Sequence, residues 1–150
     1  MASAKAQPKL YIGCSLTKAG EQFKAEVEEL KTALRGKGYE VLDFVGLVKG
    51  TPKDVYVWDI NHCVATCDAF IAICDEPAIG LGYELCEAVR SGKPVLAVAH
   101  RDTTITRLVH GAAEVEPNLS FAIYNNLTED VPQLLEKLLD KITINNKVRA

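Results

Sequence analysis

The sequence lacks the features that mark membrane proteins, secreted proteins and nucleic-acid-binding proteins. No apolar run among its 150 residues reaches the roughly 20 that a membrane-spanning helix needs, and residues 1–8 lack the apolar core of a secretory signal. Its 17 Lys and Arg residues are outnumbered by 20 Asp and Glu residues and form no basic cluster, which argues against a nucleic acid polymer as a ligand. We therefore expect a cytoplasmic protein, with the nucleus as the alternative, and no membrane contact.

Cysteine and histidine are scarce, and neither is spaced as metal ligands are. The five cysteines contain no pair in the CxxC spacing of redox and zinc motifs, and the three histidines show no ligand spacing. Buried thiols behave as small apolar groups, which fits a reducing compartment. We expect no metal and no other cofactor. The residues concerned are Cys14, Cys63, Cys67, Cys74, Cys86, His62, His100 and His110.

Apolar periodicity predicts strands and helices that alternate along the whole chain. We expect strands at 9–14, 39–44, 69–74, 94–99 and 121–124. We expect helices at 23–34, 51–65, 82–91, 105–110 and 131–142. Two of the strands, 69–74 and 94–99, are apolar on both faces, as central strands of a helix-covered parallel sheet must be.

The alternation predicts a single α/β domain over residues 1–150. Five strands alternating with five helices favour a doubly wound parallel sheet in the flavodoxin-like order 2-1-3-4-5, with helices on both faces. The segments 1–8 and 143–150 are expected to be a flexible N-terminus and a flexible tail.

Ligands of such sheets bind beyond the carboxyl ends of the strands, where the strand order reverses. Here that point lies between the first and third strands, so we expect 13–18 and 75–84 to line the site. The sequence Gly80-Leu81-Gly82 lacks the third glycine of a dinucleotide fingerprint because position 85 is Leu, and no GxxxxGK[ST] loop is present. The two glycines still allow a small ligand to approach the backbone closely.

Glu84 is the first candidate for chemistry. The spacing places it in the first turn of a helix expected from Gly82, with its side chain directed back over the glycines. The helix dipole favours an ionised carboxylate there, which is the form that a nucleophile needs. A first-turn glutamate that only stabilises its helix is the alternative interpretation.

Asp59 is the second candidate, because it interrupts a largely apolar row. At α-helical spacing it shares a face with Val55, Cys63 and Cys67. Burial raises the pKa of a carboxyl group, and two carboxyl groups in different environments let one site hold both an anion and a proton donor. Alternatively the row is turned partly to solvent, or the Asp59 carboxylate is bonded to a neighbouring loop.

Three further polar residues lie in or after the first predicted strand. The Tyr11 hydroxyl either reaches the site or is satisfied at the sheet edge, with the ring packed in the core. Ser15 and Lys18, in the following loop, either cradle an anionic group or form a polar turn.

The chain resembles the nucleoside 2-deoxyribosyltransferase superfamily, which includes the deoxynucleoside 5′-monophosphate N-glycosidases. The resemblance is carried by LYIGCS at 10–15, the helix that contains Asp59, and GLGYEL at 80–85, and it extends over nearly the whole chain. HGAA at 110–113 is similar to the glycosidase branch. The resemblance implies that Glu84 attacks the anomeric carbon and holds a covalent glycosyl intermediate, that Asp59 helps to protonate the departing base, and that Tyr11 orients Glu84.

The resemblance also implies which residues contact the substrate. Ala78 stands where phosphate-using members have Ser and base-exchanging members have Asp, and Thr17 stands where phosphate-using members have Arg, with Lys18 beside it as a substitute charge. Asn125 or Asn126 is expected near the 5′ hydroxyl of a substrate in a neighbouring subunit, which implies a homodimer or a higher homo-oligomer. The expected substrate-binding residues are Gly13, Ser15, Lys18, Ala78, Gly80, Gly82, Asn125 and Asn126.

The predicted function is cleavage of the N-glycosidic bond of 2′-deoxynucleosides or their 5′-monophosphates through Glu84, without a cofactor. The HGAA segment favours hydrolysis slightly, and a nucleoside 2-deoxyribosyltransferase that exchanges the base is the alternative. A non-catalytic nucleotide-binding module is the alternative of another class, because Ala78 and Thr17 weaken the contacts expected at the sugar end. A receiver domain is disfavoured, since 10–15 has no clustered acids to hold a metal.

Overall fold

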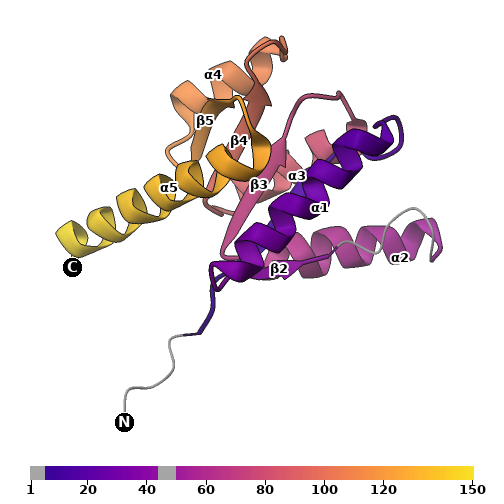
Figure 1. The fold of residues 1–150 in the computed structure, drawn as a ribbon. Coiled ribbons are helices and arrows are strands. Elements are labelled where there is room, and N and C mark those ends of the chain that lie inside the picture. The colour runs from indigo at the N-terminus through magenta and orange to yellow at the C-terminus, as the bar shows by residue number, and fades with distance from the viewer. Residues whose placement is uncertain (1–5, 44–49) are drawn as a thin grey trace.

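The order of the strands brings the candidate residues to one edge of the sheet. The computed structural model describes residues 6–43 and 50–150, and its five parallel strands lie in the order β2-β1-β3-β4-β5 (Figure 1). The predicted fold class and strand order are therefore confirmed. In chain order the elements are β1 (Lys9–Cys14), α1 (Glu21–Gly36), β2 (Glu40–Leu42), α2 (Pro52–Tyr56), the π-helix η1 (Val57–Val64), β3 (Ala69–Ile73), α3 (Ile79–Arg90), β4 (Val95–His100), α4 (Arg107–Val115), β5 (Leu119–Tyr124) and α5 (Leu127–Arg149).

The register between β1 and β3 sets the base of the site. Tyr11 lies beside Phe70, and Gly13 lies beside Ala72. All five residues of β3 are buried, which explains why the sequence there is apolar on both faces. The strand order reverses between these two strands, so their carboxyl ends form the edge where a ligand site is expected.

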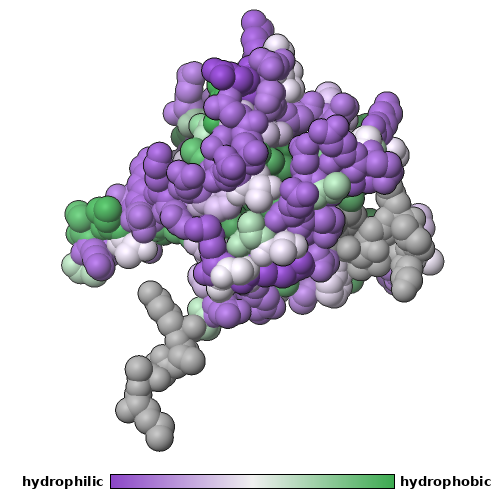
Figure 2. Space-filling view, viewed as in Figure 1, coloured by the Kyte–Doolittle hydropathy of each residue, from purple (hydrophilic) through white to green (hydrophobic). Residues whose placement is uncertain are grey.

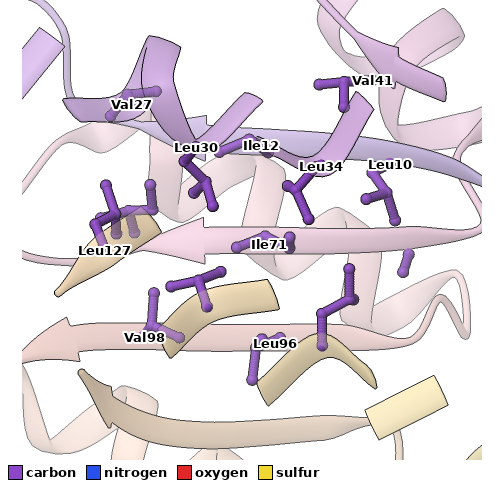
Figure 3. Close-up of a cluster of buried hydrophobic side chains, with 14 of the residues drawn as sticks. Leu10, Ile12, Val27, Leu30, Leu34, Val41, Ile71, Leu96, Val98 and Leu127 are labelled. Carbon is purple, nitrogen blue, oxygen red and sulfur yellow. The ribbon is translucent and has the colours of Figure 1, made fainter. Parts of the chain in front are cut away.

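Helices cover both faces of the sheet. On one face α1 and α5 pack together, and Figure 3 shows Leu30 and Leu34 of α1 above Ile71 of β3. On the other face η1, α3 and α4 pack over the strand side chains that point the opposite way, and these include Tyr11 and Phe70. The alternation along β1 therefore directs Tyr11 toward η1 and α3, the two helices that carry Asp59 and Glu84.

The outer surface is mostly polar. Figure 2 shows hydrophilic residues over most of one side of the molecule, with hydrophobic residues gathered at the C-terminal end of α5. In that part of α5 the side chains of Ile144 and Val148 are exposed. Within 6–43 and 50–150, no helix combines the length and hydropathy that a bilayer crossing requires.

The helix that carries Asp59 differs from the prediction. It begins after Thr51, where a capping box forms: the Thr51 hydroxyl accepts from the backbone N–H of Asp54, and the Asp54 carboxylate accepts from the backbone N–H of Thr51. After the five residues of α2 the chain continues as the π-helix η1 over Val57–Val64. Because π-helical hydrogen bonds join residues five apart, the α-helical spacing used to choose the neighbours of Asp59 does not hold here. Such segments are frequent at functional sites.

Two other helices begin at places that the sequence analysis missed. α3 begins at Ile79 rather than Gly82, because Ala78 has the extended backbone of an N-cap and both glycines are accommodated in the first turns. α4 covers Arg107–Val115 rather than 105–110, because the Thr106 side chain caps its first turn by accepting a hydrogen bond from the backbone of Leu108.

The remaining differences concern ends of elements. The expected flexible tail, 143–150, continues α5 as far as Arg149, since no Gly or Pro occurs there to end the helix. β2 is shorter than the expected strand 39–44 and ends at Leu42. Positions 44–49, which include the end of that expected strand and most of a loop that the sequence predicts at 46–50, lie outside the described residues.

Candidate active site

A cavity of about 200 Å³ opens at the carboxyl end of β1, between η1 and α3. This is the edge of the sheet at which the sequence analysis expected a site. Its lining comprises Tyr11, Ile12, Gly13, Cys14, Ser15, Leu16, Thr17, Val55, Asp59, Ala78, Gly80, Leu81 and Glu84. All three candidate catalytic residues are therefore neighbours in space, although the chain separates them widely.

Tyr11 and Glu84 are joined by a hydrogen bond. The Tyr11 hydroxyl donates to Oε1 of Glu84 over 2.8 Å. The Tyr11 ring is buried and stacks on Phe70, with ring centroids 5.5 Å apart and planes at 30°. Because the ring is fixed in the core, the hydroxyl is a preorganised donor for the carboxylate.

Gly13 makes room for the Glu84 carboxylate. A Cβ atom at this position would lie 2.9 Å from Oε2 of Glu84 and 2.7 Å from Cζ of Phe70. Any side chain larger than hydrogen would therefore push either the ring or the carboxylate out of place. Gly13 was expected to contact substrate, and in the structure it also determines where Glu84 lies.

Burial controls the charge of Glu84. The pKa of this carboxyl group is raised to about 7, mainly by burial, while the hydrogen bond from Tyr11 lowers it and the neighbouring charge of Asp59 raises it. The expectation that the helix N-terminus would favour the ionised form is wrong, because α3 begins at Ile79 and Glu84 lies beyond its first turn. Burial also raises the pKa of Tyr11, so the phenol stays protonated and keeps donating.

Asp59 lies on η1 and lines the cavity. Its Oδ1 atom is buried and has no hydrogen-bond partner among the described residues. Burial raises the pKa of this carboxyl group. Of the expected row, Val55 also lines the cavity, whereas Cys63 and Cys67 are buried in the core. A half-buried carboxyl group in the lining of the cavity can deliver a proton to a ligand there.

A second cavity, of about 360 Å³, adjoins the first at the start of α3. Ser15, Thr17, Ala78 and Gly80 line both cavities, and Lys18 lines only the second. Ala78 supplies no side-chain cap, so the first backbone N–H groups of α3, which begins beside this cavity, have no intrahelical acceptor. A Cβ at Gly80 would meet nothing within 4 Å, so its absence leaves open volume for a ligand.

The other expected substrate-binding residues lie elsewhere in the protomer. Gly82 lines a separate cavity between α3 and α4, and Glu84 is not part of its lining. Asn125 and Asn126 line a polar cavity of about 650 Å³ at the start of α5, and Oδ1 of Asn126 caps that helix by accepting from the backbone of Glu129 over 3.0 Å. None of these three residues lines the cavity that contains Glu84.

The HGAA segment also lies away from the cavity that contains Glu84. It is part of α4, and the His110 ring packs edge-on against Phe121 with centroids 4.7 Å apart. Phe70, which the sequence analysis did not single out, contacts two residues of the cavity lining. Its ring stacks on that of Tyr11 and leaves no room for a side chain at Gly13. The signal for Phe70 was the β1–β3 register, which pairs it with Tyr11.

Within 6–43 and 50–150, no three His, Cys, Asp or Glu side chains are grouped as metal ligands would be.

Comparisons with known proteins give a consistent result. No family model matches the chain. A protein of Thermofilum pendens named "Putative 2′-deoxynucleoside 5′-phosphate N-hydrolase 1" is 29% identical over 139 residues, covering 87% of this chain and 92% of its own. A protein of Nematostella vectensis with the same name is 29% identical over 142 residues, covering 89% and 95%.

Solved structures share the fold. The CMP N-glycosidase of Clostridium botulinum superposes with a TM-score of 0.66 at 23% identity, covering 84% of this chain and 97% of its own. The resemblance to the nucleoside 2-deoxyribosyltransferase superfamily is confirmed. A deoxyribosyltransferase of Leishmania mexicana, with a TM-score of 0.56 at 20% identity, covers 80% of this chain and 81% of its own. The curated relatives named here are described as N-hydrolases, and the two solved structures as an N-glycosidase and a deoxyribosyltransferase, which is the class of enzyme that the sequence analysis expected.

Proposed function

We propose that this chain is a cytoplasmic enzyme that cleaves the N-glycosidic bond of 2′-deoxynucleosides or their 5′-monophosphates, with hydrolysis slightly favoured over base transfer. The observation that carries the proposal is the 2.8 Å hydrogen bond between Tyr11 and Glu84 in a cavity that also contains Asp59. One carboxylate held by a buried donor and a second carboxyl group with a raised pKa are the two groups that retaining glycoside cleavage needs.

In the first step the Glu84 carboxylate attacks the anomeric carbon. The bond from that carbon to the base nitrogen breaks, and the base leaves with the electron pair while Asp59 supplies a proton. The hydrogen bond from Tyr11 holds one carboxylate oxygen, so the other, which lies against Gly13, is free to form the ester. Burial of Glu84 weakens its solvation and increases its reactivity once it is ionised.

In the second step an acceptor attacks the glycosyl ester and releases Glu84. Water gives the free sugar with retained configuration, and its proton returns to the Asp59 carboxylate. A second nucleobase gives a new nucleoside, which is base exchange. The names of the relatives favour hydrolysis, since those of Thermofilum pendens and Nematostella vectensis are described as N-hydrolases.

The adjoining cavity is the proposed place for the 5′ end of the sugar. Lys18, the Ser15 hydroxyl and the first N–H groups of α3 offer positive charge and donors there. A single lysine lacks the two-pronged geometry of an arginine, so a bound phosphate would be held mainly by charge. The two relatives named above are described as acting on 5′-phosphates, which agrees with this placement.

A homodimer is part of the proposal. The outer face of α2 and α3 beside the cavity carries exposed apolar side chains, of which Ile79 is 95% and Tyr83 54% exposed. Such side chains favour burial against another copy of the chain. Asn125 and Asn126, which line a different cavity from Glu84 within one protomer, would then reach the 5′ end of a substrate in the partner's cavity.

Mass-spectrometric analysis of reactions with purified protein tests the function. Deoxynucleosides and their 5′-monophosphates are incubated with the wild type, with Glu84→Ala and with the matched variant Glu87→Ala. Glu87 is a suitable control because it lies one turn along α3 and is exposed. We expect free base from the wild type and from Glu87→Ala, none from Glu84→Ala, and a covalent adduct of the sugar mass on the wild type after rapid quenching.

Two other outcomes would redirect the assignment. A base-swapped product on addition of a second free base would make the protein a transferase. Ligand binding without turnover, equal in the wild type and in Glu84→Gln, would favour the non-catalytic nucleotide-binding module and reject the proposed mechanism.

A further inference from the structure

Asp43 is the centre of a group of contacts at the end of β2. Its carboxylate forms ion pairs with Arg35, at 2.9 Å, and with Lys31, at 3.4 Å, both on α1. Its backbone carbonyl accepts a hydrogen bond of 2.7 Å from the indole N–H of Trp58, and the Cys63 thiol lies 4.0 Å from the same oxygen. The ion pairs with Lys31 and Arg35 of α1 therefore hold Asp43 in place, and the Asp43 carbonyl accepts the hydrogen bond from Trp58 of η1.

The π-helical geometry of η1 explains why two donors meet one acceptor. Trp58 and Cys63 are five residues apart, which is one turn of π-helical hydrogen bonding. In an α-helix, neighbours on one face are three or four residues apart, so this pair would diverge. The Trp58 ring also stacks on His62, with centroids 4.3 Å apart and planes at 28°. Together these contacts fix the rotation of η1 at the residue before Asp59.

Asp59 has no comparable support of its own. Its Oδ1 atom has no hydrogen-bond partner among the described residues, so the η1 backbone decides where its carboxyl group points. Orientation of a proton donor matters strongly, because a displacement of about 1 Å in a catalytic geometry can reduce the rate about 100-fold. The group of contacts around Asp43 therefore lies in a position to affect catalysis without touching the cavity.

We propose that Trp58 is a positioning residue for Asp59, and that its hydrogen bond to the Asp43 carbonyl sets the rotation of η1 and hence the distance from Asp59 to the departing base. The inference rests on the proposed function of the site. Trp58 does not line the cavity. Loss of the hydrogen bond therefore lowers kcat through the misplaced proton donor and leaves substrate affinity nearly unchanged.

The variant Trp58→Phe tests the hydrogen bond directly. It removes the indole N–H and keeps an aromatic ring that can stack on His62. We expect kcat to fall about 10-fold, with KM changed by less than about twofold. Tyr39→Phe is the matched control, because it removes one polar atom from another half-buried aromatic side chain, one that packs against the opposite core. An unchanged kcat in Trp58→Phe would overturn the proposal.

A double-mutant cycle separates positioning from a general loss of structure. If Trp58 acts through Asp59, adding Trp58→Phe to Asp59→Asn leaves kcat within about twofold of that of Asp59→Asn alone. If the two effects multiply in full, Trp58 acts by another route and the proposal is wrong.

A second variant covers the case in which Trp58→Phe does not fold. Asp43→Ala keeps the carbonyl acceptor but removes the ion pairs to Arg35 and Lys31. Trp58 is the only tryptophan of the chain, so its fluorescence reports on the contact. We expect a red-shifted emission and a several-fold lower kcat in Asp43→Ala, whereas a red-shifted emission with an unchanged kcat would overturn the proposal.

The two proposals fail in different ways. A wild type that cleaves no glycosidic bond rejects the proposed function, and the emission of Asp43→Ala still tests the contact between Asp43 and Trp58. A wild type that is active, together with variants at Trp58 and Asp43 that are equally active, rejects only the positioning role.

Discussion

The Tyr11 hydroxyl and the Glu84 carboxylate are 73 positions apart in the chain and 2.8 Å apart in the structure. Neither group can leave this contact easily, because the Tyr11 ring is stacked on Phe70 and Gly13 leaves only enough room for the Glu84 carboxylate beside it. The hydrogen bond lowers the pKa of Glu84, whereas burial raises it by more. Tyr11 thus acts as a donor that keeps part of the nucleophile ionised near neutral pH.

Tyr11→Phe removes this donor without changing the packing of the ring. The pKa of Glu84 then rises further above about 7, because burial and the charge of Asp59 are no longer opposed. Since the ionised form is the nucleophile, we expect the acidic limb of the kcat/KM profile to move to higher pH and the rate at pH 7 to fall about 10-fold to 100-fold. The measurement is the pH profile of both proteins. A limb at the same pH in both would contradict the role given to Tyr11.

Glu84→Gln should make the protein more stable at alkaline pH. The pKa of Glu84 is raised from 4.5 to about 7 in the folded state, so the folded protein holds a proton that the unfolded chain loses above pH 4.5. Stability of the wild type therefore decreases between pH 4.5 and pH 7 through this group, and above pH 7 the penalty is complete. Gln is neutral at every pH and still accepts from Tyr11. We expect a gain of about 1–3 kcal/mol at pH 8 and almost none at pH 4.

Chemical denaturation at several pH values measures this gain, with Glu87→Gln as the control. Glu87 lies on the exposed face of α3, so neutralising it should change the unfolding free energy by less than about 0.5 kcal/mol at any pH. A gain for Glu84→Gln that does not grow between pH 4.5 and pH 7 would mean that burial does not raise the pKa of Glu84 in solution.

Much of the fold could be predicted from the sequence. The apolar runs of β3 and β4 identify central parallel strands, and the alternation of elements then leaves few topologies. The approach of Tyr11 to Glu84 could be inferred only through the resemblance, because no local pattern predicts a contact across 73 residues.

Other parts of the site depend on structure that periodicity does not reveal. The start of α3 at Ile79 moved Glu84 out of the first turn, since glycines that are typical of a loop are accommodated in a helix once Ala78 supplies the extended N-cap. The π-helix η1 changed which residues share a face with Asp59, and its geometry is stabilised by tertiary contacts of Trp58 and Cys63 with Asp43. Such long-range contacts have no signal in local periodicity.

Gly13→Ala should damage both stability and activity. The added methyl group would lie 2.7 Å from the Phe70 ring and 2.9 Å from Oε2 of Glu84, both of which are closer than real Cβ contacts. Because both neighbours are packed, we expect a loss of about 1–3 kcal/mol in unfolding free energy and a drop in kcat beyond what the lost stability explains. Gly36→Ala, at a position where a Cβ meets nothing within 4 Å, is the control and should leave both unchanged or slightly raise stability. Equal kcat values for the two variants would show that Gly13 does not position Glu84.

Asp59→Asn tests whether Asp59 supplies a proton to the departing base. Asn has the same shape but no acidic proton, so cleavage of ordinary deoxynucleosides should slow by about 100-fold or more. A 7-methylguanine deoxynucleoside carries a positive charge on its base, which leaves as a neutral molecule without needing a proton. For this substrate the variant should retain most of the wild-type kcat, because the step that Asp59 assists is no longer required. Parallel kcat measurements on 2′-deoxyguanosine and its 7-methyl derivative, or on their 5′-monophosphates, provide the comparison. An equal loss on both substrates would mean that Asp59 contributes through its charge or its packing, and that the proton comes from another source.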